Sequence, residues 1–261
     1  MTAAEIAGPR PTIRISPSTI GWLSASALVW VAVVAIVSHM GNGIGTMDLG
    51  LFEFVGMWAL MMTAMMLPAV APVASLYVRT ISIGQPRRWL SFVAGYLLVW
   101  SSLGLPVYAV LRILDRIGSD TTIRVFAVVV LAAAGVYQLT PLKTVCLRHC
   151  RSPLGQLLHY GNVTGPLKEL EVAVRHAAFC VGCCWMLMAL FLAFGVMNLW
   201  AMVGLAVVVV GEKLLRRGVI LGQAAGVVLL ALALAVALSP GVARAVLPGA
   251  PAHMASPMSG M

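Results

Sequence analysis

Charged residues are scarce in this chain: they make up 10% of its 261 residues, whereas 61% are apolar. The mean hydropathy is +0.99. Soluble domains carry about 25% charged and 45–50% apolar residues, so this composition excludes a water-soluble enzyme and an intrinsically disordered protein. It predicts instead a polytopic membrane protein whose length suits one transmembrane domain.

Acidic residues are the scarcer kind: the chain has 8 Asp and Glu against 17 Lys and Arg, and its formal net charge is +9. Cytoplasmic loops of membrane proteins collect Lys and Arg, so this surplus indicates the lipid bilayer, and not a nucleic acid, as the partner. Motifs for nucleotide binding and hydrolysis are missing as well, since the chain has no P-loop, no G-x-G-x-x-G and no G-x-S-x-G. The sequence therefore offers no argument for an ATP-driven pump.

Seven stretches are candidates to cross a hydrocarbon core about 30 Å thick, which needs roughly 20 helical residues. They cover residues 20–38, 51–78, 89–113, 123–139, 173–197, 199–215 and 219–238. The sixth is short, but charge supports it: with a cytoplasmic N-terminus, 13 of the 17 Lys and Arg lie on the cytoplasmic side and 4 lie outside. Arg175 and Lys213 share that side only if residues 194–198 form a tight outer turn.

The predicted fold is an all-α, polytopic transmembrane helix bundle of about seven spans, with the N-terminus in and the C-terminus out. We expect residues 1–18 to be a disordered cytoplasmic arm, 19–239 to be the transmembrane domain, and 240–261 to be a flexible outer tail. Pro68 and Pro72 predict a kink or an early end of the second span, because proline removes a helical hydrogen bond.

The second span carries a ladder of methionines. Met57, Met61 and Met65 recur at intervals of four residues, which stacks them on one helix face, and Met62 and Met66 form an adjacent row. Neutral thioether sulfur suits Cu(I) or Ag(I). Methionine also fills irregular gaps between helices, and this packing role is the usual explanation of such a stripe.

All five cysteines and two of the five histidines occur near the cytoplasmic ends of two consecutive spans. The two groups are Cys146, His149 and Cys150 after the fourth span, and His176, Cys180, Cys183 and Cys184 in the fifth. Within each group, intervals of four residues place side chains on one face of a helix, and Cys180 and Cys183 also form a C-x-x-C pair. We expect the two groups to converge at one depth of the bundle.

Thiolate and imidazole groups together make sites for copper(I), zinc or iron. Thiols on the cytoplasmic side are kept reduced, which argues against structural disulfides. We also expect three nearby arginines to lower the thiol pKa values, namely Arg148, Arg151 and Arg175. Two alternatives stay open: cysteine packs well as a small apolar residue, and a C-x-x-C pair at a membrane edge can cycle between thiol and disulfide.

A second soft-ligand set is expected on the outer side. The first loop contains His39 and Met40 within a glycine-rich stretch, and the tail contains His253, Met254, Met258 and Met261. A glycine-rich backbone can wrap an ion, and Met and His ligands survive in an oxidising compartment better than thiols do. A flexible loop and an unstructured tail explain each piece separately.

The most unusual strings of the chain are residues 57–68 (MWALMMTAMMLP), 137–154 (YQLTPLKTVCLRHCRSPL) and 175–198 (RHAAFCVGCCWMLMALFLAFGVMN). These strings resemble a bacterial family of predicted metal-binding integral membrane proteins of unknown function, over about residues 52–217. The resemblance implies a multi-pass protein of the bacterial cytoplasmic (inner) membrane with a metal role, but no substrate or reaction. The residues that match its pattern are Cys146, Cys150, His176, Cys180, Cys183 and Cys184.

The sequence thus predicts a membrane protein that binds or transfers a soft metal ion, with copper(I) favoured over zinc or iron, and that delivers it to a membrane metalloenzyme. Two other functions stay open. One is an accessory subunit of a larger membrane complex with no chemistry of its own, and the other is a membrane thiol–disulfide oxidoreductase. Metal content, co-purifying subunits and reversible oxidation of a cysteine pair distinguish the three.

Overall fold

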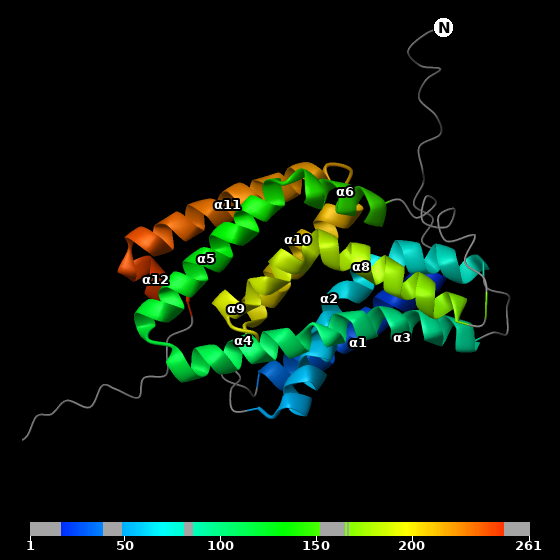
Figure 1. Ribbon diagram of the computed structural model, residues 1–261. Helices are drawn as coiled ribbons and strands as arrows, with labels where there is room; N and C mark the ends of the chain where they lie inside the picture. Colours follow the sequence, from blue (N-terminus) through cyan, green and yellow to red (C-terminus); the bar gives the residue numbers. More distant parts are fainter. Residues whose placement is uncertain (1–16, 39–48, 81–85, 152–164, 166, 248–261) are drawn as a thin grey trace, which may run out of the picture.

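The computed structural model describes residues 17–38, 49–80, 86–151, 165 and 167–247, which are almost entirely helical (Figure 1). For these residues the all-α prediction is confirmed. The helices are α1 (Pro17–Val37), α2 (Leu51–Thr80), α3 (Pro86–Ser102), α4 (Gly104–Ile117), α5 (Asp120–Leu139), α6 (Pro141–Cys150), α8 (Lys168–Ala189), α9 (Phe191–Phe194), α10 (Leu199–Leu214), α11 (Gly218–Leu238) and α12 (Pro240–Val246).

Local sequence explains where several of these helices begin. The Ser119 and Asn198 side chains accept hydrogen bonds from backbone N–H groups three residues ahead, and so cap α5 and α10. Thr140 caps α6 in the same way, and Pro141 occupies its first turn, where a backbone N–H is not needed. The cap at Thr140 lets the chain change direction between α5 and α6 (Figure 1).

Prolines act differently in the second and third predicted spans. The second span does not end early, because α2 continues past both of its prolines to Thr80. The third is divided into α3 and α4 at Leu103. Pro106 has no N–H for the Ser102 carbonyl and its ring would clash with that group, so a continuous helix is interrupted at this point.

The turn predicted before the sixth span is confirmed. Helix α9 ends before Gly195, whose φ of 86° is left-handed backbone that favours glycine, and α10 begins at Leu199. Arg175 lies near the start of α8, and Lys213 lies near the end of α10. Two successive helical runs, α8 with α9 and then α10, therefore separate them. This is the arrangement that the distribution of Lys and Arg required.

Small residues let the long helices approach closely. Helix α11 packs along α5 (Figure 1). At this contact, a side-chain carbon on Gly226 would lie 3.0 Å from the Gly135 carbonyl oxygen. Helix α3 lies along α8, where a side-chain carbon on Gly95 would lie 3.0 Å from the Cβ atom of Ala173. Such small-residue contacts are typical of helices that pack within a bilayer.

Among the described residues, five helical segments are long and apolar enough to cross a membrane: Leu51–Ala71, Leu90–Ile117, Asp120–Leu139, Lys168–Phe194 and Gly218–Leu238. Helix α1 adds a shorter apolar stretch, Leu23–Val37, and α10 has 16 residues. Large apolar side chains also face outward, since Phe52 is 90% exposed and Trp200 is 84% exposed. An apolar outer surface of this kind suits contact with lipid.

The ends of the chain were expected to be unstructured. Residues Pro240–Val246, within the range expected to form the flexible tail, form the short helix α12. Residues 248–261 of that tail and residues 1–16 lie outside the described residues, as do His39 and Met40.

Candidate metal centre

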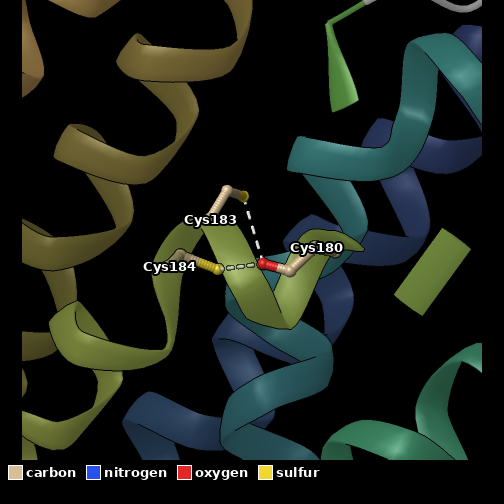
Figure 2. A group of neighbouring side chains, drawn as sticks. All are labelled: Cys180, Cys183 and Cys184. Carbon is tan, nitrogen blue, oxygen red and sulfur yellow. Dashed lines mark hydrogen bonds between the residues drawn. The ribbon is translucent and has the colours of Figure 1, made fainter. Parts of the chain in front are cut away.

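Three cysteines on one side of α8 form a compact group inside the bundle. The Sγ atoms of Cys180, Cys183 and Cys184 lie within 4.8 Å of one another, and each residue is at most 1% exposed. Figure 2 shows the Cys183 and Cys184 thiols directed at the Cys180 carbonyl oxygen, to which they donate at 3.1 Å and 2.9 Å. Spacings of three and four residues bring these side chains onto adjoining turns.

The separation of these sulfur atoms fits a soft metal ion. Metal–sulfur bonds are about 2.3 Å long, so two sulfurs on opposite sides of one ion lie about 4.6 Å apart. Within the described part of the chain, no other group of three or more His, Cys, Asp and Glu ligand atoms meets this closely. We call Cys180, Cys183 and Cys184 the cysteine site.

Two further helices reach the Cys180 sulfur. The Tyr96 hydroxyl of α3 lies 3.0 Å from it, and Nζ of Lys213, at the end of α10, donates to it at 2.9 Å. Tyr96 and Lys213 are both buried. The cysteine site is therefore the place where α3, α8 and α10 are joined by polar contacts inside an apolar bundle.

Helix α6 brings its two cysteines to α8. The Cys150 thiol is buried and forms a hydrogen bond with Cys183 of the cysteine site. Cys146 is half-buried, and its sulfur would lie 3.1 Å from a side-chain carbon on Gly182, so glycine at that position permits the close approach of α6. The structure thus brings both cysteine groups together, with Cys146 outside the compact group of three.

The arginines expected to activate the thiols have other partners. Arg151 donates to the Leu215 and Arg216 carbonyl oxygens, and Arg175 pairs with Glu171 at 2.5 Å. Arg148 is exposed. Burial raises the pKa of the Cys146 thiol, and the hydrogen bond to Cys183 together with burial raises the pKa of Cys150. Among the described residues, Lys213 is a cation that does reach the cysteines, at the Cys180 sulfur.

The two histidines flank the cysteine site without joining its compact group. His176 is buried one helical turn before Cys180, and its ring stacks on Tyr96 with centroids 5.8 Å apart. Its Nδ1 atom is buried and has no hydrogen-bond partner among the described residues. His149 comes from α6 and stacks on Phe179 with centroids 3.8 Å apart. Buried polar atoms normally have a partner, so this nitrogen of His176 is available to accept a further bond.

A comparison with known families gives this site its context. A family model described as PpoB2, copper chaperone, matches residues 55–236, which is more than two thirds of the chain. The chain belongs to this family. No curated protein and no solved structure matches it.

The PpoB2 match includes the whole candidate centre. It extends from within α2 to within α11, and so contains all five cysteines, both flanking histidines and Lys213. His39 and Met40 lie outside the matched region, and so does the tail with its His and Met residues. A buried group of soft thiols in a copper chaperone family supports a soft metal such as copper as the ion that the site binds.

The methionine ladder lies in the core of the bundle. Met57, Met61 and Met65 are buried in α2 together with Met62 and Met66, and they belong to the main apolar cluster of the bundle. This placement is what the packing role requires. Binding of a soft metal ion by these thioethers stays a prediction.

Two lysines and one carboxylate also belong to the centre, although the sequence analysis did not assign them to it. Glu212 pairs with Lys143 of α6 at 2.6 Å and accepts from Gln138 of α5 at 3.1 Å, and all three residues are buried. The signal available in the sequence was the pair Glu212 and Lys213 at the end of an apolar helix. Charged residues at membrane depth are costly, and they mark functional positions.

Proposed function

We propose that this protein is an integral membrane chaperone that binds Cu(I) as cargo at Cys180, Cys183 and Cys184 and passes it to a membrane metalloenzyme. The observation that carries the proposal is the meeting of three buried sulfurs within 4.8 Å in a chain of a copper chaperone family. Copper is the cargo of the protein in this proposal, and the cysteine site would bind it.

Copper(I) suits this set of ligands better than zinc or iron does. Thiolates bind Cu(I) and zinc alike, but structural zinc is almost always four-coordinate and tetrahedral. The compact group offers three sulfurs, and a fourth ligand for zinc would have to come from Cys150 or His176. A low coordination number therefore favours the monovalent ion.

Neighbouring thiols also favour transfer over storage. Cys150 lies against Cys183, so an ion at the cysteine site has a further thiol within one exchange step. Cys146 follows one helical turn away on α6 and is half-buried. A series of thiols of increasing exposure gives the cargo a route from the bundle interior to the α6 side, where a partner could take it.

We infer seven spans for the membrane-embedded form: α1, α2, α3 with α4, α5, α8 with α9, α10, and α11. The N-terminus would then be cytoplasmic and the C-terminus outside. Polar contacts between the helix ends on the α6 side support this arrangement, because Arg88 pairs with Glu169 at 2.5 Å and Arg151 joins α6 to the end of α10. Both arginines belong to the set that the charge distribution places in the cytoplasm.

Copper binding by the purified full-length protein tests the proposal. The detergent-solubilised protein would be titrated with Cu(I) against a chromophoric Cu(I) chelator under reducing conditions. We expect one bound ion, and Cys180→Ser should weaken its binding by about 10–100-fold, because a hard hydroxyl replaces a soft ligand.

Cys146→Ser is the matched control, since it makes the same chemical change outside the compact group, and we expect a smaller loss of copper affinity. A wild-type protein that binds no Cu(I) would refute the copper proposal. Reversible oxidation of Cys180 and Cys183 without metal would then indicate the thiol–disulfide oxidoreductase, and stoichiometric co-purification with other subunits would indicate an accessory role.

A further inference from the structure

The ammonium group of Lys213 lies directly against the cysteine site. Its Nζ atom is 2.9 Å from the Cys180 sulfur, and the residue is only 9% exposed. The adjacent carboxylate, Glu212, forms its ion pair with Lys143 instead, at 2.6 Å. Glu212 is therefore committed to another cation, and the charge of Lys213 faces the sulfur atoms.

We propose that Lys213 is the fixed counter-charge of the cysteine site and that it makes the site select a monovalent soft cation over a divalent one. This inference rests on the proposed function and names a specificity-determining residue for it. Lys213 binds no metal itself, because an ammonium group has no lone pair to offer.

The counter-charge matters because the site is buried. A Cu(I) ion held by two thiolates carries a net charge of −1, and a third thiolate makes it −2. Placing such an anion in an apolar interior is costly unless a cation lies beside it. The Lys213 ammonium, next to the Cys180 sulfur, offsets one negative charge. The Cu(I) complex with two thiolates and the ammonium together then carry no net charge.

Selectivity follows from the same charge, whatever the number of thiolates. For any given set of ligands, a Zn(II) complex carries one more positive charge than a Cu(I) complex does. The Lys213 ammonium therefore interacts less favourably with the zinc complex, by the repulsion of one unit charge at a distance of a few ångströms. Removing the lysine charge should weaken Cu(I) binding and move the preference toward Zn(II).

The test compares Cu(I) and Zn(II) affinities of the full-length protein, each by competition with a chromophoric chelator of known affinity. For Lys213→Met we expect the ratio of Cu(I) affinity to Zn(II) affinity to fall by roughly tenfold or more. Lys213→Arg keeps the charge and should stay near the wild-type ratio. Arg216→Met removes a positive charge from the exposed residue three positions away and should leave the ratio unchanged.

Folding of each variant is checked by circular dichroism and size-exclusion chromatography. If Lys213→Met does not fold, Lys213→Gln takes its place, because it keeps a hydrogen-bond donor for Cys180 without the charge. The ratio of Cu(I) affinity to Zn(II) affinity is then measured for that variant. A folded, neutral variant with the wild-type ratio would overturn the counter-charge proposal while leaving copper binding intact. A wild-type protein that binds no Cu(I) would refute the proposed function itself, so the two failures are distinguishable.

Discussion

At the scale of single residues, two adjacent residues of α10 make buried polar contacts with two different helices. Glu212 reaches Lys143 of α6, and Lys213 reaches Cys180 of α8. Consecutive helical residues point about 100° apart, so adjacent positions can serve two different helices. The end of α10 therefore contacts both α6 and the cysteine site on α8. Helix α6 carries Cys146 and Cys150.

The buried pair of Lys143 and Glu212 gives a prediction for stability. Glu212→Gln keeps an acceptor for Gln138 but leaves the Lys143 ammonium buried without a negative charge. Breaking a buried ion pair in this way is costly, so we expect the free energy of unfolding to fall by about 3 kcal/mol. Thermal unfolding of the purified protein in detergent measures the change.

The double variant Lys143→Met with Glu212→Gln is the control for that prediction. It removes both charges, so most of the lost stability should return, because neither charge is then left uncompensated. A single Glu212→Gln protein as stable as the wild type would show that this ion pair does not hold α6 against α10.

At the scale of helices, α8 carries the cysteine site while its neighbours complete it. Helix α3 supplies Tyr96, α6 supplies Cys150, and α10 supplies Lys213. Glycine at position 182 of α8 lets the Cys146 side chain of α6 come close. The thiols come from α8 and α6, whereas the charge beside them comes from α10.

Helix α2 provides a second prediction at this scale. Met61 and Met65 are buried in the core, and replacing each by Leu keeps volume and apolar character, at a cost usually below about 1.5 kcal/mol. If the ladder only packs, the double variant Met61→Leu with Met65→Leu should fold, bind copper at the cysteine site and support copper-dependent growth as the wild type does. Normal folding and copper binding with failed growth would show instead that the thioethers conduct copper.

At the scale of the whole molecule, the bundle has an apolar outer surface and an apolar core with a small group of buried polar residues. In the part of the chain that the structure describes, five helical segments are long enough to cross a membrane, and large apolar side chains such as Phe52 and Trp200 face outward. Polar groups gather instead around the cysteine site, where α3, α6, α8 and α10 meet. An apolar outer surface with a few paired polar groups buried inside is what we expect of a protein that spans a bilayer.

The orientation of the bundle in the membrane is a testable prediction. With seven spans and a cytoplasmic N-terminus, a reporter fused after Met261 should be outside, and one placed near Gln156 should be cytoplasmic. A phosphatase that is active only outside the cytoplasm and a fluorescent protein that matures only inside it measure the two positions. If the C-terminal reporter is cytoplasmic, the chain crosses the membrane an even number of times and the seven-span arrangement is wrong.

Local pattern alone was enough to predict much of this protein. The helical class followed from the apolar composition, and the turn before α10 followed from the need to place Arg175 and Lys213 on one side. The grouping of Cys180 and Cys184 on one helix face followed from 3.6 residues per turn. These features depend on residues close in sequence, or on the bilayer as a common solvent for every helix.

Only the tertiary structure decided which groups surround the cysteines. Lys213 lies 33 positions from Cys180, and Glu212 lies 69 positions from Lys143, so helix packing alone sets these contacts. Nearby arginines had been expected as the activating cations, but Arg151 and Arg175 have partners elsewhere. Helical spacing determines which side chains share a face, whereas the partners of that face depend on how closely the helices approach, as at Gly135 and Gly226.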